Sequence, residues 1–190
     1  VADLGCGWGT FSYALAERGV DVVGVDFSQR SIDFCEGRRT PHRGVVQPDF
    51  LCADAGDTGL PGGSFETVLA ADLFEHLYPE DSERVVREAF RLLKPGGRFS
   101  TWTPHRGHIL EILKNHDILL KRDPTHVDYK SMQRMQDLLT AAGFAIEKAY
   151  FAESHVPGLR TAERLVQRWI PILRRRIAVL GRKPIERSAS

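Results

Sequence analysis

A glycine-rich turn near the start of the chain constrains its fold more than any other feature. Residues 1–6 form a short, mainly apolar run that leads into Gly5-Cys6-Gly7-Trp8-Gly9, and apolar side chains then recur at helical spacing over 11–15. Glycine lets a backbone turn sharply and approach a ligand without a Cβ clash. A strand, a glycine turn and a helix in this order are typical of a nucleotide site at the carboxyl edge of an α/β sheet.

Strand and helix patterns alternate along the rest of the chain, which predicts an α/β fold with a mainly parallel sheet. A chain of 190 residues suits one domain, expected over 1–184 with a disordered tail at 185–190. Helices are expected to begin after the caps Ser28 and Ser131. Further helices are expected at 79–94 and 160–173, and further strands at 20–25, 50–53, 65–71, 98–103, 144–151 and 177–180. Pro48 indicates that the strand 50–53 lies at an edge of the sheet, where a missing N–H is tolerated.

The spacing of the glycines indicates which nucleotide the turn would bind. The dinucleotide fingerprint GxGxxG needs glycine at position 10, where this chain has Thr10. Asp3 stands two positions before Gly5, and its carboxylate would repel a pyrophosphate but attract the amino group and sulfonium of a cationic ligand. A strand-to-helix turn without a ligand is the alternative, and an NAD-dependent oxidoreductase is the competing enzyme class.

Two further carboxylates follow predicted strands. Asp26 ends the strand 20–25, where it can bind both hydroxyls of a ribose. Asp54 ends the strand 50–53, where it can accept a hydrogen bond from an adenine amino group. Each residue alone is equally consistent with a helix or turn cap. Their order after the glycine turn favours the nucleotide site.

Together these motifs resemble those of the class I S-adenosylmethionine-dependent methyltransferases. The matching segments are DLGCGWG, VVGVDFS, CADAGDTGLPGGSFETVLAADLFEHL, RLLKPGGRF and IAVLGRKP, and they extend over nearly the whole chain. The resemblance implies a three-layer, Rossmann-like α/β sandwich with strand order 3-2-1-4-5-7-6 and an antiparallel seventh strand. It implies S-adenosyl-L-methionine as the cofactor. We expect the methyl group to go to a small-molecule acceptor, at oxygen rather than nitrogen or carbon.

The resemblance also assigns residues to the cofactor. Asp26 is expected to contact the ribose, and Asp54 and Ala55 the adenine. The expected contacts with the methionine part are Asp3, Gly5, Gly7, Gly9 and Asp72. Cys6 and Phe27, from the same motifs, are further expected cofactor contacts. Family members usually carry one or two helices before the first strand, which cover the cofactor. This chain has none before Val1, so we expect amino-terminal helices to be missing from it.

Candidate catalytic residues follow the strand 65–71, at the mouth of the expected cofactor site. His76 is suited to take a proton from an acceptor hydroxyl, because histidine changes protonation near neutral pH, and Glu75 stands beside it. Alternatively, both residues only support the helix that follows. The pair also resembles a segment of quinone-biosynthesis O-methyltransferases that can hold a divalent ion. Asp72 would be the only further acidic ligand, so no metal is predicted.

Residues 104–130 have weak periodicity and four histidines, and we expect an insertion on the substrate side there. His126, near Tyr129, is the third catalytic candidate, and His105 is a further candidate for substrate contact. A zinc site at His105 and His108 is not favoured, because no paired cysteines accompany it.

Composition bears on partners and location. The net charge of +1 gives no electrostatic signal for nucleic acid, and no apolar run reaches the length of a membrane-spanning helix. The 3 scattered cysteines indicate a reduced, cytoplasmic protein. Basic residues around 169–173 could form a membrane-surface patch, although packing of that segment on the sheet is favoured. The alternative function is a cofactor-binding subunit that does not catalyse, and the oligomeric state is left open.

Overall fold

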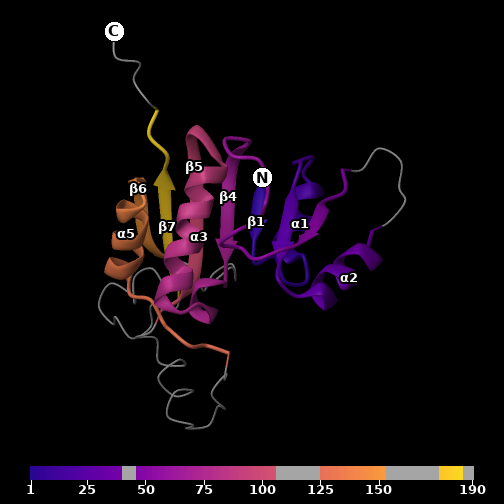
Figure 1. Ribbon diagram of the computed structural model, residues 1–190, viewed down its shortest axis with the longest axis horizontal. Coiled ribbons are helices and arrows are strands. Elements are labelled where there is room, and N and C mark those ends of the chain that lie inside the picture. The colour runs from indigo at the N-terminus through magenta and orange to yellow at the C-terminus, as the bar shows by residue number, and fades with distance from the viewer. Residues whose placement is uncertain (40–45, 106–124, 153–175, 186–190) are drawn as a thin grey trace, which may run out of the picture.

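Seven strands form one sheet in the order β3-β2-β1-β4-β5-β7-β6 (Figure 1). This computed structural model describes residues 1–39, 46–105, 125–152 and 176–185. Neighbouring strands from β3 to β5 run parallel, whereas β7 is antiparallel to both β5 and β6. The strand order and the antiparallel seventh strand are therefore confirmed. The strands are β1 (Ala2–Leu4), β2 (Val23–Asp26), β3 (Asp49–Cys52), β4 (Phe65–Ala71), β5 (Leu93–Pro104), β6 (Ala145–Ala152) and β7 (Arg176–Arg182).

The central strand β1 is buried along its whole length. Ala2 pairs with Val23 of β2 on one side and with Val68 of β4 on the other. Apolar side chains such as Ala2 and Leu4 suit a parallel strand that is covered on both faces. Asp3, between them, is the exception, and its surroundings are described below. β3 stands at one end of the strand order, so the edge position predicted from Pro48 is confirmed.

Four α-helices and one short 3-10 helix connect the described strands. They are α1 (Thr10–Ala16), α2 (Gln29–Gly37), η1 (Phe74–His76), α3 (Pro79–Leu92) and α5 (Met132–Ala141). Both predicted caps form: the Ser28 hydroxyl accepts from the Ser31 N–H of α2, and the Ser131 hydroxyl accepts from the Arg134 N–H of α5.

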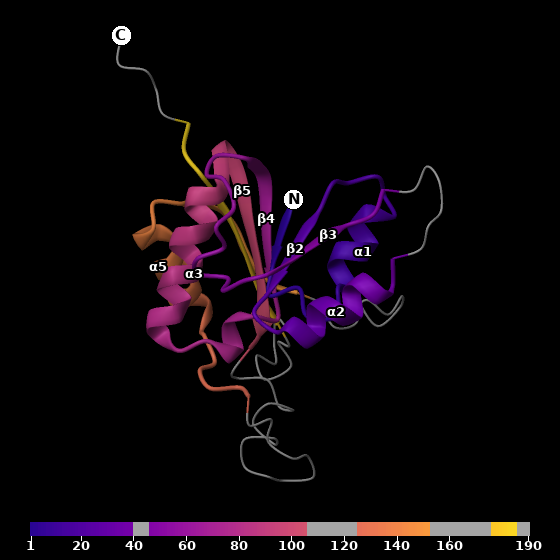
Figure 2. The same ribbon diagram turned by 45° about the vertical axis from the view of Figure 1, so that its right-hand side comes forward.

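The helices lie on both faces of the sheet, which gives the three predicted layers (Figure 2). Successive side chains of a strand point to opposite faces, so residues three apart also face opposite ways. In β5, Phe99 contacts Phe144, which follows α5, and Phe74 of η1. Trp102 of the same strand contacts Phe11 of α1 instead. Helices α3 and α5 therefore cover one face, and α1 and α2 the other.

Strand and helix boundaries differ from the prediction in places. The helix expected to reach residue 94 ends at Leu92, and β5 begins at Leu93 rather than Arg98. The reason is pairing: Leu93 is already opposite Phe65 of β4, and the turn that follows is bonded to Lys183 through the backbone of Gly96 and Gly97.

β1 is also shorter than expected. It ends at Leu4 because the N–H groups of Gly5 and Cys6 both turn toward the carbonyl of Val25, at 2.8 and 3.0 Å. β7 is longer, because seven residues of it, from Arg176 to Arg182, pair with β5.

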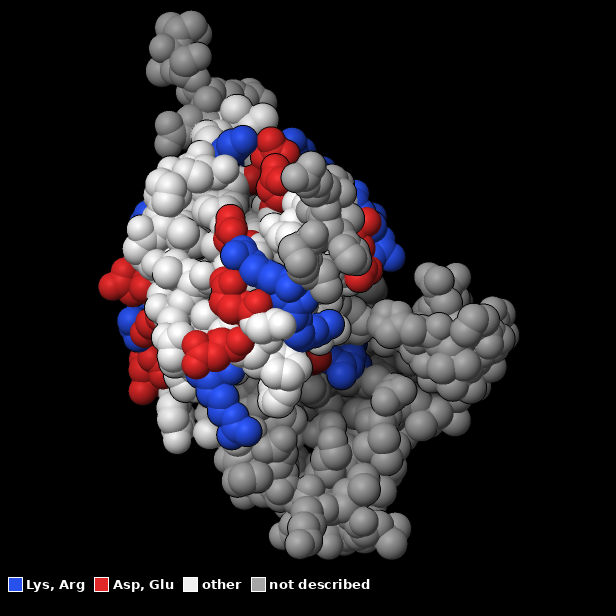
Figure 3. Space-filling view, turned by 90° about the vertical axis from the view of Figure 1, so that its right-hand side faces the viewer, with Lys and Arg blue, Asp and Glu red and all other residues white. Residues whose placement is uncertain are grey.

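Some expectations lie outside the described residues. These are the helix 160–173 with most of the basic residues around it, most of the expected insertion with His108 and His116, and most of the tail. No helix in the described ranges is long and apolar enough to cross a membrane. On the face drawn in Figure 3, acidic and basic side chains of the described residues are interspersed.

Candidate functional site

A cavity of about 820 Å³ opens at the carboxyl ends of the parallel strands. This is the edge at which the chain leaves β4 for η1 and α3 (Figure 1). Ligand sites of α/β sheets lie at this edge, and the volume suits a small ligand. The lining residues are Gly5, Gly7, Trp8, Asp26, Phe27, Ser28, Ser31, Asp54, Ala55, Asp72, Leu73, His76, Leu77, Asp81, Val85 and Thr125.

The glycine turn after β1 forms one wall of the cavity. Gly5, Gly7 and Gly9 have φ angles of +71°, +51° and +74°, a region that L side chains rarely adopt. Gly5 is also in close contact with the turn after β4, since a Cβ added there would lie 2.7 Å from Leu73 Cδ1. Both the backbone conformation and the packing therefore require glycine at position 5.

Asp26 lies at the end of β2 with its carboxylate fixed by the backbone on both sides. Its Oδ2 accepts from the Gly7 N–H and its Oδ1 from the Ser28 N–H, each at 2.9 Å. Each carboxylate oxygen keeps a further lone pair. The geometry can therefore accept two vicinal hydroxyl groups, as a ribose presents them. Phe27, next in the chain, is exposed at the same wall.

Asp54 is oriented by a bond to each of its carboxylate oxygens. Oδ1 accepts from the Gly56 N–H at 2.7 Å, and Oδ2 accepts from the guanidinium of Arg84 on α3 at 2.8 Å. The pair with Arg84 is largely exposed, so it adds little to stability. The ion pair instead orients the Asp54 side chain, which lines the cavity beside Ala55.

Asp3 lies beneath the glycine turn rather than in the wall of the cavity. Its side chain is buried, and Ser12 of α1 donates a hydrogen bond to its Oδ2 at 2.6 Å. Burial raises the pKa of the Asp3 carboxyl to about 6, although the bond from Ser12 acts in the opposite direction. Cys6 and Gly9, two other expected cofactor contacts, are also not among the described residues that line the cavity.

Asp72 follows β4 in a left-handed conformation, with φ of +53°. Its N–H donates to the Trp102 carbonyl at 2.8 Å, and its carboxylate forms an ion pair with Arg176 at the start of β7. The Arg176 guanidinium also lies over the Trp102 ring, 5.4 Å from its centre. These contacts fix Asp72 at the cavity that it lines.

The turn η1 places Glu75 and His76 in different surroundings. The Glu75 side chain is buried, its Oε2 accepts from the Thr103 hydroxyl at 2.9 Å, and burial raises the pKa of its carboxyl. His76 lines the cavity, and its Nδ1 lies 3.0 Å from the Thr125 carbonyl oxygen. Of this pair, His76 is therefore the residue that lines the cavity.

The structure brings His126 next to the pair. Its ring centre lies 4.9 Å from that of His76, at a steep angle. Glu75, His76 and His126 each offer a potential ligand atom, and these atoms lie within 4.8 Å of one another. Asp72, the acidic ligand considered from the sequence, is paired with Arg176 instead. That no metal is used stays a prediction.

The remaining candidate from the substrate side is His105, whose ring lies 5.0 Å from the Phe151 ring of β6. Tyr129, which the sequence places near His126, has its hydroxyl 2.8 Å from Nδ1 of His126. Several cavity residues were not identified from the sequence. Four of them stand inside the quoted motifs and could have been inferred from them: Trp8, Ser28, Leu73 and Leu77. The others have no local signal, because their role depends on how the connections and α3 fold over the strand ends; they are Ser31, Asp81, Val85 and Thr125.

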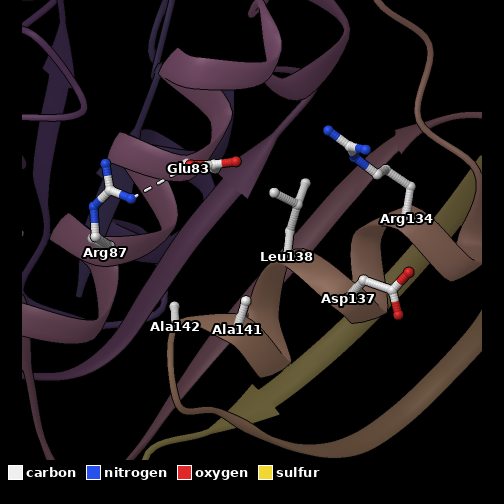
Figure 4. A pocket seen from close by; sticks show the side chains of 7 residues that line it. All are labelled: Glu83, Arg87, Arg134, Asp137, Leu138, Ala141 and Ala142. Carbon is white, nitrogen blue, oxygen red and sulfur yellow. Dashed lines mark ion pairs between the residues drawn. The ribbon is translucent and has the colours of Figure 1, made fainter.

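A second, smaller cavity of about 330 Å³ lies between α3 and α5 (Figure 4). Its walls carry Glu83 and Arg87 of α3, which form an ion pair, and the α5 residues Arg134 and Asp137. It shares no lining residue with the cavity at the strand ends. The larger cavity is therefore the candidate site.

Comparison with known proteins identifies the family of the chain. A family model described as a methyltransferase domain matches residues 1–97. The ubiquinone biosynthesis O-methyltransferase of Pseudomonas fluorescens (strain SBW25) is 30% identical over 142 residues, which are 73% of this chain and 60% of that protein. The chain thus spans about 60% of the length of this curated relative.

Solved structures share the fold over almost the whole chain. A SAM-dependent methyltransferase from Methanosarcina mazei has a TM-score of 0.75 at 21% identity, covering 97% of this chain and 92% of that one. Magnesium protoporphyrin IX methyltransferase from Synechocystis PCC 6803, solved with bound SAH, has a TM-score of 0.68 at 20% identity, covering 96% and 72%. With half of its length matched by the family model and the strand order of the fold complete, the chain belongs to the class I S-adenosylmethionine-dependent methyltransferases.

Proposed function

We propose that this protein transfers a methyl group from S-adenosylmethionine to a hydroxyl oxygen of a small-molecule acceptor. One observation carries the choice of cofactor: among the described residues, the Asp26 carboxylate is bonded at the cavity by backbone N–H groups, whereas the other lining carboxylates, of Asp54, Asp72 and Asp81, lie in ion pairs with Arg84 or Arg176. None of the described lining residues is a lysine or an arginine, so the Asp26 charge makes this wall favourable for an ammonium or a sulfonium and unfavourable for a pyrophosphate. It therefore supports S-adenosylmethionine and argues against NAD.

The residues present fit this cofactor part by part. Gly5 and Gly7 offer backbone without side chains to the methionine part, and Asp26 offers two oxygens to the ribose. Asp54 and Ala55 stand where the adenine would lie, and the Asp72 backbone closes the methionine end. Asp3 would act through the glycine turn, as a buried charge whose field favours a cation.

His76 is the proposed general base. When bound, the cofactor supplies a methyl carbon attached to a positive sulfur. His76 would accept the proton of the acceptor hydroxyl as the oxygen attacks that carbon in line. Glu75 would support η1 from within the core, and His126 would flank the imidazole. The Pseudomonas fluorescens relative is an O-methyltransferase, which supports oxygen as the methylated atom.

The cofactor assignment is tested by calorimetry with S-adenosylhomocysteine and NAD. S-adenosylhomocysteine should bind and NAD should not. Asp26→Ala should weaken S-adenosylhomocysteine binding by about 1.5–3 kcal/mol, since it removes hydrogen bonds to a charged group. Asp33→Ala, which changes an exposed carboxylate on α2 outside the cavity, is the matched control and should bind like the wild type. Equal binding of both nucleotides, or no loss in Asp26→Ala, would contradict the assignment.

Location and partners stay proposals as well. A cytoplasmic protein is supported by Cys6, Cys35 and Cys52, which are all free thiols. A small-molecule acceptor without a nucleic-acid partner is supported by the nearly balanced charge of the chain.

A further inference from the structure

The segment Thr125–Lys130 is bonded tightly to η1, the turn that carries His76. The N–H groups of Val127 and Asp128 both donate to the carbonyl of Glu75, at 2.9 and 3.3 Å. These residues are about fifty positions away from η1 in the chain. The segment therefore fixes the backbone of the turn from outside the βα connection that forms it.

Lys130 makes the strongest part of this attachment. Its side chain is only 1% exposed, and its Nζ lies 3.1 Å from the Phe74 carbonyl and 2.9 Å from the Leu77 carbonyl, one on each side of His76. Nζ also lies 3.2 and 2.8 Å from the carbonyl and the carboxylate of Asp128. An ammonium has three N–H donors, and all of them are used here.

The ammonium of Lys130 thus joins both ends of η1 to the Thr125–Lys130 segment. Burial lowers the pKa of Lys130, and the Asp128 carboxylate acts against this shift. An unpaired buried ammonium would be costly, so these contacts define one geometry for the turn.

The same segment determines which nitrogen of His76 carries the proton. Nδ1 of His76 lies 3.0 Å from the Thr125 carbonyl oxygen, which can only accept a hydrogen bond. Nδ1 must therefore be the donor, and in the neutral imidazole the lone pair is on Nε2. Among the described residues, no hydrogen bond occupies Nε2.

We propose that Lys130 is a positioning residue, which ties the Thr125–Lys130 segment to η1 and so holds His76 as the Nδ1–H tautomer with Nε2 presented to the cavity. The assignment of the His76 tautomer to Lys130 and its segment depends on these contacts alone. Its consequence for turnover rests on the proposed function, in which Nε2 of His76 receives the proton of the acceptor.

The direct test is nitrogen-15 NMR of the histidine rings in the full chain, at about pH 8.5 where histidine is neutral. Lys130→Met keeps the length of the side chain and removes its donors. Lys148→Met, on the exposed part of β6, is the matched control. His76→Gln identifies the His76 signals by their loss. Protein is dialysed against EDTA beforehand, so that adventitious metal does not fix the ring.

The wild type and Lys148→Met should show His76 as the Nδ1–H tautomer. Lys130→Met should show a mixture shifted toward Nε2–H, because the Thr125 carbonyl is no longer held in place. Asp128→Ala keeps Lys130 but removes the carboxylate that pairs with it, so this variant should shift the tautomer less and in the same direction. It replaces Lys130→Met as the test variant if Lys130→Met does not fold. An unchanged His76 tautomer in the folded variants would overturn the proposal.

Binding and turnover separate this inference from the proposed function. Calorimetry should give the same S-adenosylhomocysteine affinity for Lys130→Met and the wild type, within about twofold. Methyl transfer to a soluble catechol used as probe should fall roughly 10- to 100-fold in kcat for Lys130→Met, as expected when a catalytic group is misplaced by about 1 Å. His76→Gln should lose roughly 10²–10⁴-fold. A tautomer shift with full turnover in His76→Gln would uphold the positioning by Lys130 and reject His76 as the base.

Discussion

At the scale of the single residue, Asp3 carries a carboxyl group whose ionisation the fold opposes. It is buried under the glycine turn, and its pKa is raised from 3.8 to about 6. The folded state therefore favours the protonated form. Asp3 adds to stability below pH 3.8, and this contribution is lost as the pH rises through about 6. The shift corresponds to about 3 kcal/mol.

We therefore expect Asp3→Asn to be more stable than the wild type near neutral pH, by up to about 3 kcal/mol, and the two to converge in acid. Urea unfolding at a series of pH values measures the difference. Asp33→Asn, at an exposed carboxyl group, should keep the pH slope of the wild type. If Asp3→Asn keeps that slope too, burial of Asp3 does not control this part of the pH dependence.

The sequence indicated some residues of the cavity and missed others. Asp26 and Asp54 were found because each directly follows a strand, and strand ends meet at one edge of a parallel sheet. Arg84, Lys130 and Arg176 were missed as partners of the site. Each reaches its partner from another part of the chain, and a side-chain contact across thirty or more residues leaves no periodic signal.

At the scale of the element, the turn between β1 and α1 requires glycine at position 5 for two reasons, its backbone conformation and its packing. Gly5→Ala should lose stability on two counts: about 1–2 kcal/mol for the left-handed backbone and about 1–3 kcal/mol for the contact with Leu73. Gly59→Ala is the matched control, because Gly59 has φ of +69° and open space where its Cβ would lie. Only Gly5→Ala should also weaken binding of S-adenosylhomocysteine. Thermal unfolding and calorimetry on both variants measure this, and equal losses in the two would show that packing against Leu73 is unimportant.

The boundary between α3 and β5 shows why element ends were harder to predict than element types. The apolar spacing of the helix continues to Leu93, and Pro95 is the first residue that a helix cannot continue through. Pairing of Leu93 with Phe65 decides the boundary instead. That contact depends on the neighbouring strand, and a local pattern does not contain it.

At the scale of the whole molecule, alternation of strands and helices predicted the α/β class, but the strand order came from the family resemblance. Periodicity shows that a strand is buried and does not show which strand is its neighbour. The antiparallel β7 illustrates this, because Ile177 to Val179 is as buried as the central parallel strand β1 is. The position of the site then follows from the fold, since all the parallel strands of the sheet end at the same edge.

That position predicts where a bound nucleotide should protect the backbone. In hydrogen exchange of the full chain, S-adenosylhomocysteine should slow exchange in the connections after β1, β2, β3 and β4, over residues 5–9, 26–31, 54–56 and 72–77, because each of these connections contains residues that line the cavity at the strand ends. The smaller cavity, between α3 and α5, is the internal control, and residues 134–142 should exchange at an unchanged rate (Figure 4).

At a ligand concentration of 100 times Kd, binding stabilises the folded state by about 2.7 kcal/mol, so amides that exchange only by global unfolding slow equally everywhere. The local protection must therefore be read from amides that exchange by smaller openings. Protection of residues 134–142 with none at the strand ends would place the nucleotide in the smaller cavity and reject the site at the strand ends.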